Sequence, residues 1–297
     1  MSLRLIYGRS GSGKSSFIYD EIESKIKQNS KIYIITPEQF SFTAEKKLME
    51  HANGAVINAE VLTFNRMAYR VLKETGGNIK QDLSKCGKAM LIYDILTKNK
   101  KNLKFLGKSD ENIDIVGTQI TEFKKHGITV ETLENTKNEM QDKYLKCKTE
   151  DMLLVYNEFQ KVISDRFIDE TDRLTYLSEK IEEVCDFENT IIYIDEFVGF
   201  TKQEYEIIRK LLKTSKSVSV TVCADDLELN KLPDTDIFYS NKVTAKKILD
   251  LAKDENIKIE KSIKVENKNN RFKTPELKFI EENLYSIPQK KIWWENR

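Results

Sequence analysis

The order of apolar and polar residues predicts two kinds of element in the outer parts of the chain. Short apolar runs bounded by polar residues are typical of buried strands, and apolar residues spaced three and four apart indicate helices. The predicted strands are 3–7, 31–36, 56–62, 190–194 and 218–223, followed by a short alternating strand at 257–265. The predicted helices are 14–26, 42–51, 65–74, 202–212, 243–253 and 274–284. Strands that alternate with helices in this way predict a parallel sheet with helices on its faces.

The middle of the chain has a different pattern. After Gly76 and Gly77, helical spacing extends from about residue 83 to 186, and no convincing strand interrupts it. The predicted helices here are 88–96, 113–125, 150–167 and 175–185. We therefore predict an α/β fold in which residues 1–78 and 187–297 form a parallel sheet flanked by helices. Residues 79–186 form an all-helical insertion.

A phosphate-binding loop follows the first predicted strand. Residues 8–15 read GRSGSGKS, which fits the pattern G-x-x-x-x-G-K-[ST] between a strand and a helix. Glycines let such a loop curl, so that its N–H groups and the start of the helix face a polyphosphate. Lys14 is expected to neutralise phosphate oxygens and Ser15 to bind Mg²⁺. The pattern predicts a P-loop NTPase that binds ATP with Mg²⁺, through Gly8, Arg9, Ser10, Gly11, Ser12, Gly13, Lys14, Ser15 and Ser16.

Acidic residues end two of the later strands. Asp195 and Glu196 follow the apolar strand 190–194. At the carboxyl end of a parallel strand, Asp195 is placed to hold the metal, and Glu196 to orient or deprotonate a water. We therefore predict Asp195 as a metal ligand with Ser15, and Lys14 and Glu196 as catalytic residues. Asp225 and Asp226 stand where a helicase has a glutamine that senses the γ-phosphate, so we interpret them as acids at the start of a loop.

Composition narrows the functional class only slightly. The formal net charge is +1, so overall charge gives no argument for or against nucleic acid. The cysteines Cys86, Cys147, Cys185 and Cys223 have no metal-site spacing, which favours free thiols in a reducing cytoplasm. No apolar run approaches the length of a membrane span, and we expect no membrane contact and a cytoplasmic location.

Three further segments carry a resemblance to a known family. They are TPEQFSFT at 36–43, LTFNRMAYRVL at 62–72 and FVGFTKQE at 197–204. In this order, and together with the phosphate loop, they resemble the N-terminal helicase-like part of the AddB (RexB) family. The Thr-Phe-Asn at 63–65 is also similar to the Thr-Phe-His segment of UvrD-type superfamily 1 helicases. The resemblance implies one subunit of a helicase–nuclease that pairs with an AddA-type subunit and processes broken DNA ends for repair and recombination.

The resembling segments also contain candidate DNA contacts. Polar side chains at predicted strand ends are suited to hydrogen bonds with phosphates, and aromatic rings are suited to stacking on unpaired bases. The polar candidates are Thr36, Gln39, Thr63 and Asn65, and the aromatic candidates are Phe40 and Phe64. The alternative is structural, with Thr63 and Asn65 capping a helix and the two phenylalanines in the core.

The sequence departs from the family in ways that leave three functions open. Only seven residues precede Gly8, so the upstream glutamine that reads adenine in these helicases is absent. The second helicase domain and the nuclease domain with its iron–sulfur cluster are absent too, so we expect an N-terminal fragment with weak or no hydrolysis by itself. The alternatives are a P-loop kinase or phosphotransferase and a degenerate, non-hydrolysing scaffold. A helicase-type core requires one strand between the strand at 191 and the loop strand.

Overall fold

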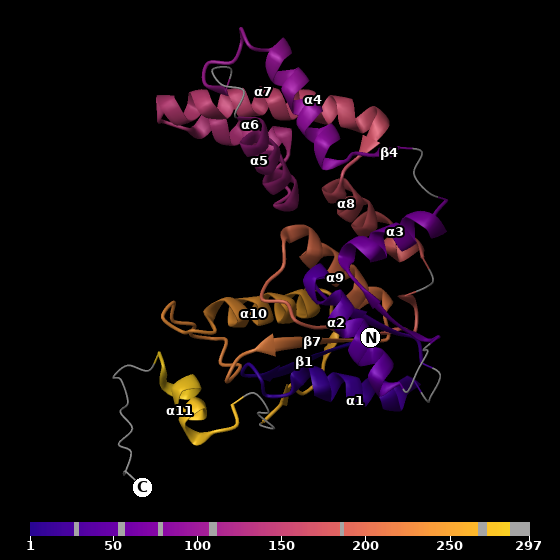
Figure 1. The fold of residues 1–297 in the computed structure, drawn as a ribbon. Helices are drawn as coiled ribbons and strands as arrows, with labels where there is room; N and C mark the ends of the chain where they lie inside the picture. Colours follow the sequence, from indigo (N-terminus) through magenta and orange to yellow (C-terminus); the bar gives the residue numbers. More distant parts are fainter. Residues whose placement is uncertain are drawn as a thin grey trace. The chain divides into compact units, whose positions relative to one another are not determined.

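The computed structural model describes residues 1–26, 30–52, 57–76, 80–106, 112–184, 187–266 and 272–285 (Figure 1). Val56 and Cys185, which bound two predicted elements, lie outside these ranges. The chain packs as two compact units. The sheet unit comprises Met1–Thr63, Asp186–Phe200 and Leu211–Arg297, and the helical unit comprises Phe64–Cys185 and Thr201–Lys210. The sequence suggested 79–186 for the insertion, whereas packing also gathers residues 64–78 and 201–210 into the helical unit.

The sheet unit is built on a parallel sheet. Its strands lie in the order β3-β2-β6-β7-β1-β8, and β9 also pairs with β1. The bounds are β1 Ser2–Gly8, β2 Ile32–Ile35, β3 Ala59–Leu62, β6 Ile191–Ile194, β7 Ser217–Cys223, β8 Lys258–Ile259 and β9 Ile263–Lys264. In register, Leu5 of β1 lies opposite Val220 of β7, and Ile194 of β6 lies opposite that same Val220. One strand, β7, thus separates β6 from the loop strand β1, which confirms the strand order expected of a helicase-type core.

The connections that follow β1 and β7 leave these neighbouring strands in opposite directions. From β1 the chain runs through α1 (Lys14–Ile26) to β2 on one side, whereas from β7 it runs through α10 (Tyr239–Asp254) to β8 on the other. These two helices cover opposite faces of the sheet (Figure 1). Ligands of parallel α/β sheets bind at the carboxyl edge where successive connections leave in opposite directions. Here that position lies between β1 and β7.

Apolar packing explains the local structure around β1. Ile18, Tyr19 and Ile22, spaced three and four apart on α1, are buried against strand residues that include Ile6 and Ile34. The helix α2 (Glu38–His51) adds Ala44 and Leu48 to the same core. The last helix of the unit, α11 (Pro275–Asn283), buries none of its residues. The phosphate-loop end of the sheet is therefore held by a tightly packed core, and α11 is joined to it by polar contacts.

The helical unit has its own core. Its helices are α3 Phe64–Glu74, α4 Lys85–Lys98, α5 Ile113–Lys125, α6 Val130–Glu139, α7 Lys143–Arg166, α8 Glu170–Lys180 and the start of α9 Lys202–Thr214, with a 3₁₀ turn at Ile181–Glu183. Ile92, Ile120, Val155 and Phe159 lie at the centre of this core and are buried. The expectation of no strand here was wrong in one detail, because β4 (Gln81–Asp82) pairs in parallel with β5 (Phe167–Ile168).

Candidate nucleotide site

Three glycines shape the phosphate loop. Gly11 and Gly13 have φ of 77° and 97°, in the left-handed region that side chains disfavour. A Cβ on Gly8 would lie 2.5 Å from Ser12 Oγ and 2.7 Å from the carbonyl oxygen of Val265, so this position requires glycine. The N–H of Phe17 donates to Gly13 O at 2.9 Å and starts the helix directly after the loop. The local sequence thus enforces an open, curled turn at the N-terminus of α1.

The ammonium of Lys14 is folded back over this turn. Its Nζ donates to the carbonyl oxygens of Gly8 at 2.8 Å and Arg9 at 3.0 Å. Neutral carbonyls are weak partners for a cation, so an arriving phosphate competes easily for the same ammonium. The structure therefore holds Lys14 at the loop, with partners that an anion can replace.

The two predicted acids follow β6 and differ in their surroundings. Asp195 is buried, with 4% of its surface exposed, and its Oδ1 accepts from Thr221 Oγ1 at 2.6 Å and from the N–H of Glu196 at 3.0 Å. Glu196 has a left-handed φ of 66°, and its Oε1 accepts from Ser15 Oγ at 3.1 Å. The buried threonine on β7 holds Asp195, and the serine after Lys14 holds Glu196.

These groups line one cavity of about 580 Å³ at the carboxyl end of the sheet. Its lining residues are Ser10, Gly11, Gly13, Lys14, Ser15, Ser16, Phe40, Lys47, Asp195, Glu196, Phe197, Val198, Thr221, Cys223 and Asn241. The sequence did not indicate Lys47, Thr221 or Asn241 as site residues. Thr221 carried only a weak signal, because it is one of the polar residues that alternate with valines in the predicted strand 218–223. Lys47 and Asn241 carried none, since only the tertiary fold places them at the cavity.

Burial raises the pKa of Tyr19 on α1, and the carboxylates Asp195 and Glu196 raise it further. The Tyr19 hydroxyl stays protonated and donates to Ala44 O at 3.3 Å. The two acids after β6 thus place negative charge near Tyr19, and a cation bound between these acids and Ser15 would be attracted by the same charge.

The donor set fits the metal that the sequence suggests. A serine hydroxyl and two carboxylates supply oxygen atoms only, which are the ligands that Mg²⁺ prefers. Within the described ranges, no group of three His, Cys, Asp or Glu side chains forms a protein-only metal site. Mg²⁺ commonly binds through one or two carboxylates together with substrate phosphates and water. The arrangement of Ser15, Asp195 and Glu196 suits that mode.

Three other residues considered from the sequence do not line this cavity, namely Arg9, Asp225 and Asp226. The Arg9 side chain donates to Glu281 Oε1 at 2.8 Å and to Glu281 O at 2.9 Å, and its guanidinium lies 5.3 Å from the Phe238 ring. The positive charge of Arg9 is thus paired with the carboxylate of Glu281 on α11. Asp225 and Asp226 bind Lys242 Nζ at 3.1 Å and 2.9 Å. This agrees with their interpretation as loop acids, since both pair with the buried ammonium of Lys242.

The candidate DNA contacts fall into two groups by exposure. Thr36, Thr63 and Phe64 are buried, with 1%, 4% and 5% of their surfaces exposed, so in this conformation they offer little surface to a ligand. The Asn65 amide donates to Glu170 Oε1 at 2.6 Å, on the neighbouring α8. Gln39 is exposed, and Phe40 is 36% exposed at the cavity. Gln39 and Phe40 are therefore the accessible members of the set.

Comparison of the sequence with known proteins identifies its family. The sequence profile described as "ADDB, N-terminal" matches residues 5–281. The chain belongs to the ADDB N-terminal family. The match spans both the sheet unit and the helical unit, so it covers the phosphate loop and the acids after β6 alike.

The names of individual proteins with similar sequences are consistent with this family. The chain is 40% identical over 299 residues to a Clostridium botulinum protein named as the B subunit of an ATP-dependent helicase/deoxyribonuclease. Proteins with the same name from Clostridium tetani and Acetivibrio thermocellus are 41% and 38% identical. Each alignment covers 98% of this chain and 26% of the relative, so the ADDB N-terminal chain spans about a quarter of the length of these curated relatives.

No described helix of the chain is both long enough and apolar enough to cross a membrane.

Proposed function

We propose that the sheet unit binds ATP with Mg²⁺ and serves as the nucleotide-binding N-terminal part of the B subunit of an ATP-dependent helicase/deoxyribonuclease. The observation that carries the proposal is that Lys14, Ser15, Asp195 and Glu196 line one cavity, although they come from segments far apart in the sequence. A curled loop at a helix N-terminus provides amides for a polyphosphate. Across that loop, the Asp195 carboxylate provides a metal ligand and Glu196 lies beside it.

Each residue has a distinct role in this proposal. Lys14 leaves its two loop carbonyls and binds the phosphate oxygens. Ser15 and Asp195 would hold the metal, which would supply positive charge to neutralise the phosphates. Thr221 positions Asp195 through the hydrogen bond described above, and Glu196 accepts a hydrogen bond from water and orients it. No arginine lines the described cavity, so we expect nucleotide binding with slow hydrolysis from this chain alone.

The wider role rests on the relatives, whose names describe one part of a DNA-acting enzyme. We propose that the full-length protein pairs with an AddA-type subunit and acts on broken DNA ends in repair and recombination. The exposed Gln39 and Phe40 are the best-placed candidates of this chain for contact with a single strand, because they are accessible beside the nucleotide cavity. The order of the strands argues against the kinase alternative.

The test is calorimetric titration of the chain with ATP in the presence of Mg²⁺ and then with a chelator. Saturable binding of one nucleotide per chain that weakens without Mg²⁺ is expected. No binding under either condition would refute the nucleotide site. Binding of a single-stranded oligonucleotide, which should weaken as salt rises, tests the DNA role separately.

A further inference from the structure

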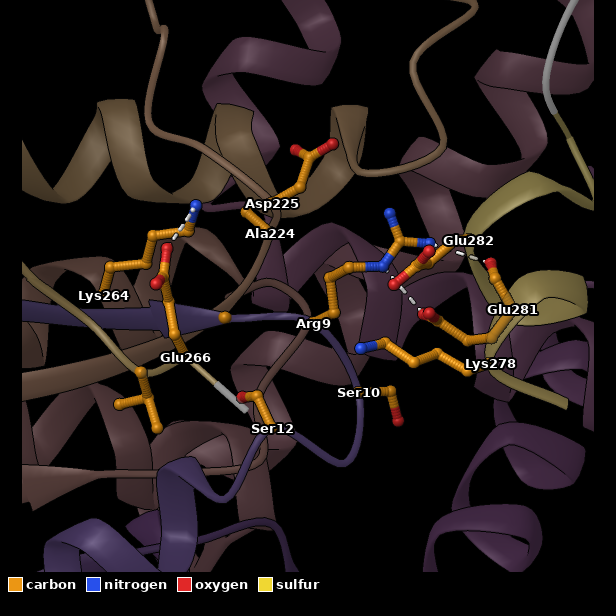
Figure 2. A pocket seen from close by; sticks show the side chains of 12 residues that line it. Arg9, Ser10, Ser12, Ala224, Asp225, Lys264, Glu266, Lys278, Glu281 and Glu282 are labelled. Carbon is orange, nitrogen blue, oxygen red and sulfur yellow. Dashed lines mark hydrogen bonds and ion pairs between the residues drawn. The ribbon is translucent and has the colours of Figure 1, made fainter. Parts of the chain in front are cut away.

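A second pocket, of about 280 Å³, lies beside the phosphate loop (Figure 2). It is lined by Gly8, Arg9, Ser10, Ser12, Ala224, Asp225, Lys264, Val265, Glu266, Lys278, Glu281 and Glu282. These residues come from the loop, the end of β7, the end of β9 and the helix α11. Ser10 lines both this pocket and the larger cavity that contains Lys14. The two spaces therefore meet at the phosphate loop, at the carboxyl edge of the sheet where β1 and β7 end.

Two ion pairs and a backbone hydrogen bond hold the segments that line the pocket. Figure 2 shows one ion pair on each side, Arg9 with Glu281 and Lys264 with Glu266. The N–H of Val265 donates to Tyr7 O at 2.7 Å and fixes the segment after β9 that lines the pocket. The Arg9 contact reaches both the side chain and the backbone carbonyl of Glu281, so α11 is tied to the phosphate loop itself.

The pocket has no excess of positive charge to attract a phosphate. Four carboxylates (Asp225, Glu266, Glu281 and Glu282) line it together with three cationic side chains (Arg9, Lys264 and Lys278), and Asp225 also pairs with Lys242. The larger cavity has two lysines, a helix N-terminus and a fitting site for Mg²⁺, and so it attracts the polyphosphate. Carboxylates accept hydrogen bonds from hydroxyl and amino groups, which are the donors that a ribose and a purine or cytosine base present.

One residue of the pocket wall has a buried hydroxyl without a hydrogen-bond partner within the described structure. Ser12 is 8% exposed, and its Oγ has no hydrogen-bond partner there. A buried hydroxyl without a partner costs free energy, because it has given up its hydrogen bonds to water. Ser12 lines the pocket from the loop side, next to Gly8. Rotation of the Ser12 side chain would bring this hydroxyl to the pocket, where a polar, uncharged ligand group would offer the missing partner.

We propose that this second pocket receives the nucleoside end of the nucleotide whose phosphates lie in the larger cavity. The inference rests on the proposed nucleotide function. It assigns recognition of the ribose and base to residues 264–266 and to α11, so that the C-terminal part of the described chain contributes to nucleotide affinity.

The experiment compares two ligands, ATP and inorganic tripolyphosphate, each titrated calorimetrically with Mg²⁺ present. The variant Glu282→Trp places a bulky ring at the pocket from an exposed position of α11, where it leaves the core untouched. The matched control is Leu284→Trp, at a 59% exposed position that does not line the pocket. We expect Glu282→Trp to weaken ATP binding at least about tenfold and to leave tripolyphosphate binding unchanged, whereas Leu284→Trp changes neither.

The possible failures are distinguishable. If Glu282→Trp binds ATP as the wild type does, the pocket is not the nucleoside site, although the phosphate site stands. If Glu282→Trp loses both ligands equally, the change acts on the phosphates and the inference is also wrong. If the wild type binds neither ligand, the nucleotide function itself fails and the inference fails with it.

Discussion

The hydroxyl of Ser15 donates to Glu196 Oε1 at 3.1 Å, across 181 residues of sequence. Ser15 stands in the first turn of α1 and Glu196 two residues beyond the end of β6, so the contact joins the phosphate loop to the acidic strand end. The left-handed backbone of Glu196 turns the chain directly after Asp195. The two sequence motifs that were expected to share a magnesium ion thus meet in one site.

The first prediction concerns that ion. Replacing Ser15 with Ala removes the hydroxyl, and we expect the gain in ATP affinity on adding Mg²⁺ to fall about tenfold or more. Mutation of a group that only supports a metal ligand typically costs about 10–100-fold in metal affinity, and Ser15 is itself the expected ligand. Titrations with Mg²⁺ and with a chelator measure the gain. Ser24→Ala, on the same helix but exposed and bonded to Glu21 O, should leave it unchanged; an unchanged gain in Ser15→Ala would remove Ser15 from the metal site.

The second prediction concerns the support of Asp195. Thr221→Val keeps the shape of the side chain but removes the 2.6 Å hydrogen bond to a carboxylate that is 4% exposed. Leaving a buried acceptor short of a donor costs about 1–3 kcal/mol, so we expect a loss of that size in the free energy of unfolding. Urea denaturation measures it. The control Thr118→Val removes an exposed hydroxyl and should change stability by less than about 0.5 kcal/mol. Equal stabilities for the two variants would show that Thr221 does not hold Asp195.

The third prediction concerns the acids after β7. Lys242 is 4% exposed, and its Nζ lies 3.1 Å, 2.9 Å and 2.8 Å from carboxylates of Asp225, Asp226 and Asp236. Lys242→Met should destabilise the fold by about 1–3 kcal/mol at neutral pH, less than a fully buried pair because the acids are partly exposed. Lys246→Met, at an exposed position of the same helix, is the matched control and should have little effect.

This contribution should depend on pH. Burial alone would raise the pKa of Asp226, but the Glu228 N–H and the Lys242 ammonium outweigh it and lower that pKa. Burial also acts to raise the pKa of Asp236, but the Lys242 ammonium and the Phe238 N–H outweigh it, so this pKa is lowered too. A lowered carboxyl pKa stabilises the fold above the unfolded pKa of about 4, and this stabilisation is lost as the pH falls through the folded value. The difference between wild type and Lys242→Met should therefore shrink below about pH 4. A difference that grew on acidification would contradict the assignment.

The sequence predicted those elements whose signals are local. The helix at 14–26 was predicted with its observed ends, because the loop glycines mark its start and its apolar spacing is clear. The helix α6 was missed because Leu133 is its buried residue and the other side chains give little periodicity. The alternating segment 257–265 became two short strands, since each pairs with a different part of β1.

Only the two sequence motifs of the site could be predicted, and not the way in which they come together. The phosphate loop and the acids at 195–196 could be found from spacing alone. Their meeting depends on β6, β7 and β1 lying in that order, which is a tertiary property. The capture of Arg9 by Glu281 was not predictable either, because nothing in the loop sequence indicates that α11 packs beside it. For Phe64 the structural alternative was correct, because this residue lies on the buried face of α3 with Met67 and Val71.

The most direct test of the account compares Lys14→Ala with Lys46→Ala in calorimetric titrations with ATP and Mg²⁺. Both variants remove one lysine charge, but Lys14 lines the nucleotide cavity, whereas Lys46 is exposed on α2 beside Glu50. We expect Lys14→Ala to weaken ATP binding at least about a hundredfold, because a charge-assisted contact of roughly 3 kcal/mol is removed. Lys46→Ala should bind ATP as the wild type does. Equal affinity of Lys14→Ala and wild type would contradict the claim that this loop holds the polyphosphate.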